Sequence, residues 1–270
     1  MESLGYRIKK RIRRPFMRFY WRYLSDACFA KQKKDRIAGN DSKYLKLKGL
    51  KGIKTGNSCV IVGNGPSLKV EDLESISKLG IDMFGANRLF SVFEQTSWRP
   101  TYYCFQDHNV YEQIRRDFET SNIDGIELIF ITQFMKSKKK NCCRVPVNFY
   151  DHWINHNTDK YHFSNNAYEE IADGFSVTIM AIQLAYYMGY SKVYLIGCDN
   201  SYKKQKHFYT ENDIKVDITA TDRISRGFEA VREFCDKTSD FDVYNISRGG
   251  ELEIFPRISM DDFLRGHNEN

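Results

Sequence analysis

The chain has 270 residues, of which 41% are hydrophobic and 28% charged, and its formal net charge is +6. This length suits one large domain or one domain with an appendage, and no apolar run is long enough to span a membrane. The seven cysteines show no C-x-x-C spacing, which argues against both a disulfide framework and a zinc site. We therefore expect a reducing, cytoplasmic setting and no bound metal.

The charge is divided unevenly along the chain. Residues 1–54 contain 17 Lys and Arg against 4 Asp and Glu, whereas residues 55–270 contain 24 basic and 31 acidic residues. A basic arm attached to a mildly acidic body is typical of proteins that contact a polyanionic surface with one face. We predict two parts: a basic amphipathic arm and linker over 1–54, with an irregular stretch at 31–54, and a catalytic domain over 55–270.

The arm itself, residues 1–25, combines aromatic and basic side chains. Apolar residues recur every three or four positions, so one helical face is apolar and the other cationic. These residues are Ile8, Ile12, Phe16, Phe19 and Tyr23. Such a pattern favours an anionic membrane surface. The alternatives are a helix packed on the body and nucleic acid, and we do not expect nucleic acid.

The body begins with an apolar run at Cys59–Val62, which predicts a strand buried on both faces. The turn Gly63-Asn64-Gly65-Pro66-Ser67 follows, and a helix is expected from Pro66 or Ser67 to Ile76. A strand, a small-residue turn and a helix N-terminus together expose backbone N–H groups to a phosphate. The turn matches neither G-x-G-x-x-G nor a P-loop, and a tight turn without a ligand is the alternative.

Strands and helices alternate through the rest of the chain, which predicts an α/β fold with a mostly parallel, doubly wound, Rossmann-like sheet and helices on both faces. Residues 136–168 are expected to form a long irregular insertion or lid. The predicted strands are 81–87, 102–107, 126–132, 193–199 and 241–246, and the predicted helices are 110–120, 175–187 and 222–238.

Polar residues follow the ends of five predicted strands. Ligands of open α/β sheets bind outside the carboxyl ends of the strands, so these residues are candidates for reading a nucleobase and sugar hydroxyls. They are Asn64, Ser67, Asn87, Arg88, Gln106, Asp107, Asp199, Tyr202, Asn245 and Ser247. Asp199 has three open roles: orienting a sugar hydroxyl, binding a metal, or capping the next helix. His207 lies in the polar stretch beyond Asp199 and is the candidate general base, and His108, after Asp107, is the second choice.

Two motifs carry a resemblance to a known family. The first is Val60–Leu68, with Asn87-Arg88-Leu89-Phe90 after it, and the second is Met188–Asp199. Together they resemble the bacterial family 42 sialyltransferases and their wider relatives, which include glycosyltransferases of capsule and lipopolysaccharide synthesis and a pterin diphosphokinase branch. The resemblance covers residues 58–250 in patches. It implies a GT-A-like domain that binds a CMP-activated sugar without a metal.

The resemblance also implies roles for individual residues. Asn64 and Ser67 would contact the nucleotide or its phosphate, and Asn87 the donor. Gln106 or Asp107 would take the place of a donor-binding asparagine. The remaining implied residues are Ser176 near the donor, and Tyr202 and Tyr209 at the leaving phosphate.

This sequence departs from the family in two respects. The family's histidine base lies further beyond the second motif than His207 does, and its membrane-attaching segment is C-terminal rather than N-terminal. His207 is therefore a hypothesis that rests on its placement.

The function expected from the sequence is transfer of sialic acid or a similar sugar from a CMP-activated donor to a surface glycan, by a metal-independent, base-assisted reaction. The partners would be the nucleotide-sugar donor, the glycan acceptor and the inner face of the cell membrane. Two alternatives stay open: a diphosphokinase that needs ATP and Mg²⁺, and a non-catalytic nucleotide-binding module. A homo-oligomer also stays open.

Overall fold

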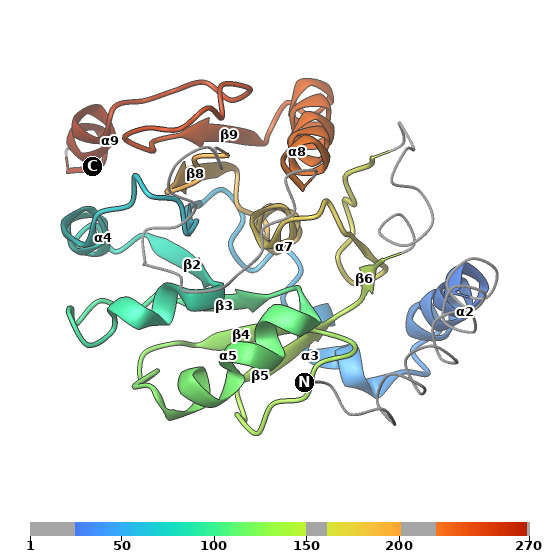
Figure 1. Cartoon of the computed structure of the whole chain (residues 1–270). Coiled ribbons are helices and arrows are strands. Elements are labelled where there is room, and N and C mark those ends of the chain that lie inside the picture. The colour runs from blue at the N-terminus through green and yellow to red at the C-terminus, as the bar shows by residue number, and fades with distance from the viewer. Residues whose placement is uncertain (1–24, 150–160, 201–219, 269–270) are drawn as a thin grey trace, which may run out of the picture.

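The computed structural model describes residues 25–149, 161–200 and 220–268, and its centre is a seven-stranded parallel sheet (Figure 1). The strand order is β5-β4-β3-β2-β1-β8-β9, and every neighbouring pair is parallel. The order therefore reverses beside β1, which makes the carboxyl ends of β1 and β8 a topological switch point. The strands are β1 Ser58–Val62, β2 Asp82–Ala86, β3 Tyr102–Phe105, β4 Leu128–Thr132, β5 Cys142–Val145, β8 Lys192–Ile196 and β9 Asp242–Asn245. The predicted α/β fold is confirmed.

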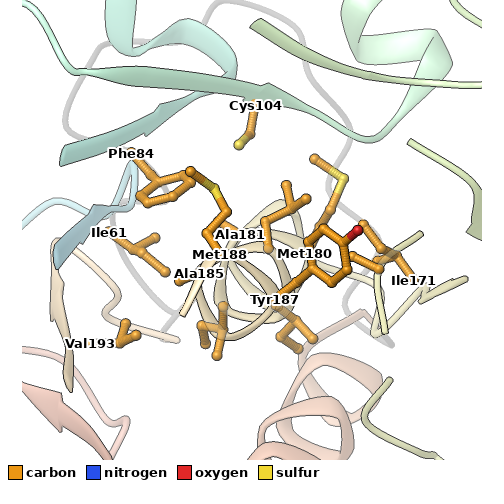
Figure 2. Packing of buried hydrophobic residues seen from close by; sticks show 14 of the residues in the cluster. Ile61, Phe84, Cys104, Ile171, Met180, Ala181, Ala185, Tyr187, Met188 and Val193 are labelled. Atoms are coloured by element: carbon orange, nitrogen blue, oxygen red, sulfur yellow. The ribbon is translucent and has the colours of Figure 1, made fainter. Parts of the chain in front are cut away.

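Helices cover both faces of this sheet, because its strands are apolar on both sides. One face packs against α7 (Val177–Met188) and α8 (Ala220–Lys237). Figure 2 shows α7 surrounded by buried side chains such as Ile61 and Phe84 from the strands. The other face packs against the elements α4 Val70–Ser77, η3 Asn87–Val92, α5 His108–Thr120 and α9 Met260–Asn268. Sequence patterns did not indicate α9.

The ends of α7 follow local sequence signals. The Ser176 side chain accepts a hydrogen bond from the Thr178 N–H (3.3 Å), and Gly189 ends the helix with a left-handed φ of 99°. The start predicted for α4 is wrong, because the helix begins at Val70 with Lys69 as its N-cap. The physical reason is that Asp199 holds Ser67 in the turn, so the chain becomes helical only three residues later.

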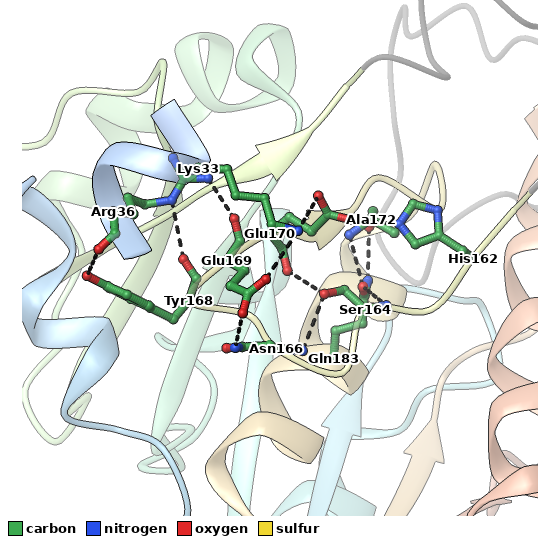
Figure 3. A network of polar contacts seen from close by, with 10 residues as sticks. All are labelled: Lys33, Arg36, His162, Ser164, Asn166, Tyr168, Glu169, Glu170, Ala172 and Gln183. Carbon is green, nitrogen blue, oxygen red and sulfur yellow. Dashed lines mark hydrogen bonds and ion pairs between the residues drawn. The ribbon is translucent and has the colours of Figure 1, made fainter. Parts of the chain in front are cut away.

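The irregular linker predicted over 31–54 is wrong, because this stretch folds against the body. It contains α2 (Ser25–Ile37), η2 (Ser42–Tyr44) and α3 (Leu45–Lys48). Arg36 of α2 is fully buried and donates to the carbonyl oxygens of Tyr168 (3.3 Å) and Glu169 (2.6 Å), while the Tyr168 hydroxyl donates to the Arg36 carbonyl (2.7 Å; Figure 3). The two main-chain carbonyl groups thus allow Arg36 to be buried, although the high content of Lys and Arg in this stretch predicts that it is exposed to solvent.

The irregular insertion predicted over 136–168 is also only partly correct. Strand β5 extends the main sheet at its edge, and β6 (Val147–Asn148) pairs in parallel with β7 (Ile171–Ala172) in a small second sheet. Short strands with mixed burial lack the apolar run that marks the central strands.

The amphipathic arm at 1–25 lies almost entirely outside the described residues, so its membrane contact stays a prediction. The domain boundary at 54 lies within them and also stays a prediction, although Tyr44 and Leu47 before it pack in the same hydrophobic core as the sheet. Among the helices that the structure describes, none is both long and apolar enough to span a bilayer.

Candidate functional site

A pocket of about 110 Å³ opens at the carboxyl ends of β1, β2 and β8, at the switch point of the sheet. Strand-end turns, the N-terminus of α7 and one side of α8 form its walls. The lining residues are Gly63, Asn64, Gly65, Asn87, Ser176, Val177, Thr178, Gly197, Cys198, Asp199, Asn200, Ile224 and Phe228. The structure therefore brings together six of the predicted site residues: Gly63, Asn64, Gly65, Asn87, Ser176 and Asp199.

The glycines of the β1 turn are required because this turn lies directly against the one after β8. The Gly65 N–H donates to the Gly197 carbonyl oxygen at 2.7 Å. A Cβ atom on Gly63 would lie 2.3 Å from that same oxygen, and one on Gly65 would lie 2.5 Å from the Asp199 carboxylate. Both distances are shorter than any real contact, so only glycine allows the two turns to form one wall of the pocket.

Asp199 fixes the far end of the β1 turn. Its buried carboxylate accepts hydrogen bonds from the Ser67 N–H (2.7 Å) and from the Ser67 hydroxyl. The two bonds use both carboxylate oxygens, so in this structure Asp199 holds the turn in place. Burial beside Asp199 raises the pKa of the Cys198 thiol to about 12, which keeps this lining cysteine protonated and unreactive at neutral pH.

Two asparagines of the pocket lining present hydrogen-bond acceptors without partners in the described part of the chain. Asn64 donates through Nδ2 to the Ala86 carbonyl (3.1 Å), and Asn200 donates to the Ser225 hydroxyl (2.9 Å). These bonds fix both amides, yet each Oδ1 atom is buried and accepts nothing. Unpaired buried acceptors are costly, so their presence in a pocket lining indicates a ligand that donates hydrogen bonds.

Asn200 is a site residue that sequence reasoning missed. Its signal was its position directly after Asp199, at the end of a buried strand. Its backbone φ of 49° is left-handed, as are those of Asn87 (52°) and Phe175 (56°), and no other non-glycine residue in the described ranges has such a value. Asn87 and Asn200 line the pocket, and Phe175 immediately precedes its Ser176 wall. Strained backbone that gathers at one place is typical of a functional site.

The N-terminus of α7 supplies the electrostatic character of the pocket. Ser176, Val177 and Thr178 all line it, so the first N–H groups of a twelve-residue helix lie at its wall. The helix dipole at this end favours an anion such as a phosphate, although the Thr178 N–H already donates to the Ser176 hydroxyl.

Other predicted site residues have structural partners instead. Gln106 is buried and donates to the Asp173 carbonyl (2.7 Å) and its carboxylate, and Asp107 caps α5 by accepting from the Asn109 N–H at 2.7 Å. Arg88 is half-buried and does not line the pocket.

The two residues predicted at the end of β9 serve the turn that follows this strand. Asn245 donates to the Leu252 carbonyl (2.8 Å) and accepts from the Ser247 N–H (2.9 Å), and the Ser247 hydroxyl accepts from the Cys198 N–H (3.2 Å). Their side chains thus support the pocket wall at Cys198 from behind.

The three predicted catalytic residues, Tyr202, His207 and Tyr209, lie outside the described residues. Asn200, the last described residue before them, and Ile224 of α8, which follows them, both line the pocket. Within the ranges that the structure describes, no group of three or more His, Cys, Asp or Glu side chains is arranged to hold a metal ion.

Comparison with known proteins shows a fold shared with solved structures and a match to one protein family. The Maf glycosyltransferase from Magnetospirillum magneticum AMB-1 is 15% identical with a TM-score of 0.52, and the match covers 81% of this chain and 37% of that one. This chain thus spans little more than a third of that enzyme, and at such identity the likeness shows the fold alone. The sialyltransferase CstII from Campylobacter jejuni, in complex with a substrate analogue, cytidine-5'-monophosphate, is 15% identical with a TM-score of 0.45 over 76% of this chain and 86% of that one.

A comparison with curated proteins finds no match. The model of one protein family, described as 6-hydroxymethylpterin diphosphokinase MptE-like, matches residues 35–205, which is more than half of the chain and includes β1 through β8 with most of the pocket. The glycine turn after β1 and the neighbouring end of β8, which together form one wall of the pocket, therefore both lie within the match, and the chain belongs to the MptE-like family.

Proposed function

We propose that this protein is a glycosyltransferase that binds a nucleotide-activated sugar, with CMP as the nucleotide, and moves the sugar to a glycan acceptor. The observation that supports it most is the combination of the α7 N-terminus with the buried acceptors of Asn64 and Asn200 in one pocket. The helix end suits a phosphate, and two fixed acceptors suit an exocyclic amine or ribose hydroxyls. The fold is shared with a protein described as a glycosyltransferase.

The proposed reaction needs few groups. The oxygen of an acceptor hydroxyl bonds to the anomeric carbon of the sugar, while the bond from that carbon to the phosphate oxygen of CMP breaks. His207 would take the hydroxyl proton, and Tyr202 and Tyr209 would donate hydrogen bonds to the departing phosphate. The N–H groups at the start of α7 would stabilise the same negative charge as it develops.

The family match favours a second candidate, a diphosphokinase, which would transfer diphosphate from ATP with Mg²⁺. Asp199 is the carboxylate that lines the pocket, and both of its oxygens bond to Ser67. Kinases of this type hold Mg²⁺ through carboxylates and substrate phosphates. The second candidate therefore requires a carboxylate from outside the described residues, or release of Asp199 from Ser67.

Thermal unfolding with CMP, CDP, UDP, GDP, ADP and ATP separates these candidates. A ligand that binds only the folded protein raises the midpoint, and at a hundred times its Kd it adds about 2.7 kcal/mol. We expect the largest rise with CMP, unchanged by EDTA. A rise only with ATP and Mg²⁺ would contradict the glycosyltransferase and support the diphosphokinase. Binding of CMP by calorimetry, without donor hydrolysis or transfer, would indicate the non-catalytic module.

The base role of His207 has a direct test. His207→Ala should lower turnover at least tenfold with an unchanged thermal midpoint, because the acceptor hydroxyl would lose its proton acceptor. His108→Ala is the matched control, since His108 is exposed at the start of α5 and does not line the pocket. Full activity of the His207 variant would remove this residue from the mechanism without affecting the nucleotide assignment.

A further inference from the structure

Most of the exposed large hydrophobic side chains of the described residues fall in one short segment of the chain. Four large hydrophobic side chains of the described chain are exposed: Ile37 (54%), Leu45 (53%), Ile53 (51%) and Phe134 (51%). Three of them lie within the short segment 37–53, whereas Phe134 follows the carboxyl end of β4 and packs against the Phe149 ring. Scattered exposed residues need no explanation, but a local group of them marks an interaction surface.

The same segments are strongly basic. Residues 40–56 and 136–144 together contain ten Lys and Arg and a single acidic residue, Asp41. They lie side by side, because the Lys46 ammonium donates to the carbonyl oxygens of Lys140 (3.2 Å) and Cys142 (3.0 Å). We call residues 43–54 with 136–140 the lysine patch.

The charge of the lysine patch is mostly uncompensated. Of its five lysines between 43 and 54, Lys54 alone lies within ion-pair distance of a carboxylate in the described chain, at 2.8 Å from Asp82. Lys43, Lys46, Lys48 and Lys51 are exposed. Since the rest of the body is acidic overall, this local field attracts an anionic partner to one side of the protein.

The backbone beneath the lysine patch is held firmly. The buried Arg36 guanidinium lies 5.0 Å from the Tyr44 ring centroid, and the Tyr187 hydroxyl donates to the Lys48 carbonyl (3.4 Å). Tyr44 and Leu47 belong to the main hydrophobic core. Leu45 and the lysines therefore project from a fixed surface and lose little backbone freedom on binding.

We infer that the lysine patch binds an anionic membrane surface. Exposed aliphatic side chains beside lysines that mostly have no carboxylate partner in the described chain suit the interface of a bilayer, where apolar groups enter between headgroups and ammonium groups meet lipid phosphates. A nucleic-acid site would favour exposed aromatic rings for stacking, whereas Ile37, Leu45 and Ile53 are aliphatic.

The position of the patch suits this partner. Lys46 bonds to the first residue of β5, at the amino ends of the strands, while the pocket lies at their carboxyl ends. Membrane contact through the patch therefore leaves the pocket open to solvent and to a water-soluble nucleotide.

Co-sedimentation of the full chain with vesicles tests this inference, whatever reaction the pocket performs. The vesicles contain phosphatidylcholine alone or with phosphatidylglycerol. A lysine near an anionic membrane contributes a factor of roughly five, so Lys43→Gln with Lys51→Gln should weaken binding to the anionic vesicles roughly 25-fold. Leu45→Ser with Ile53→Ser should weaken it by a similar factor, because fewer apolar groups enter the interface.

The matched control is Lys78→Gln with Arg265→Gln, which removes the same charge. Both residues are exposed: Lys78 directly follows α4 and Arg265 lies on α9, and these helices lie on the other side of the molecule from α2 and α3 (Figure 1). We expect less than a twofold change for the control and unchanged thermal midpoints for all variants. Equal binding by patch and control variants would overturn the inference. It would also be overturned if the patch variants lost affinity for RNA while the wild-type chain ignored the anionic vesicles.

Discussion

Replacing Gly63 with alanine is expected to destabilise the protein by about 3 kcal/mol and to abolish the effect of any pocket ligand on its thermal midpoint. The added Cβ would lie 2.3 Å from the Gly197 carbonyl oxygen and 2.8 Å from its carbon, and backbone atoms that directly follow two paired central strands cannot move aside cheaply. Separation of the β1 and β8 turns would also break the hydrogen bond from Gly65 to Gly197. Chemical unfolding with and without nucleotide measures both effects.

Gly249→Ala is the matched control for this prediction. Gly249 lies beside the same turn, but a Cβ there would be 3.5 Å from the Ser67 Cβ, which is an ordinary contact. We expect its free energy of unfolding to change by less than about 0.5 kcal/mol, as for an unremarkable surface substitution. If both alanine variants were equally stable and bound ligand equally well, the close approach of the two turns would not be what shapes the pocket.

Gln183→Leu is expected to cost about 4 kcal/mol of stability, although it preserves volume in the middle of α7. The Gln183 Oε1 accepts from the N–H groups of Ser164 (3.0 Å) and Ala172 (2.9 Å), and its Nε2 donates to the Ala172 carbonyl (2.9 Å; Figure 3). The side chain is fully buried, so leucine would leave three main-chain groups without partners and without water. Denaturant unfolding measures the loss.

The control is Gln113→Leu, because Gln113 lies on the exposed side of α5 and should change stability by less than about 0.5 kcal/mol. We also expect Gln183→Leu to disturb the pocket, because Ala172 is followed within four residues by Ser176, the N-cap of α7. A Gln183→Leu protein as stable as the wild type would show that the loop at 164–172 finds other partners.

Gly63 and Gln183 both show that the pocket depends on contacts between segments that are far apart in sequence. Gln106 illustrates it, because its amide holds Asp173, 67 residues away, just before the left-handed pair Gly174 and Phe175. That pair turns the chain into Ser176 at the start of α7. We interpret Gln106 as a residue that positions the helix end rather than one that touches the nucleotide.

Local patterns were sufficient for six of the seven strands of the main sheet, all but β5, and for the centre of the pocket. Apolar runs such as Cys59–Val62 predicted the central strands, since burial on both faces leaves a signal within a few consecutive residues. Gly63, Asn64 and Gly65 were identified in the same way, because a strand, a glycine turn and a helix start are adjacent in the chain.

The tertiary structure alone decided which strand-end side chains face the pocket. Asn64 and Asp107 both follow strands, yet one lines the cavity and the other caps a helix. Asn245 is buried behind the pocket by its bonds to Leu252 and Ser247. The physical reason is that a polar side chain bonds to whichever partner the folded chain brings nearest.

Contacts between segments far apart in sequence also explain why the prediction for residues 31–54 was wrong. The composition of these residues predicted an irregular linker. Instead, carbonyl groups more than 130 residues away in sequence accept hydrogen bonds from the Arg36 guanidinium and hold α2 against the body. Sequence by itself determined that this region is basic and where its apolar residues lie. Only the folded chain decided that α3 and the loop before β5 meet, because their contact joins residues separated by more than 90 positions.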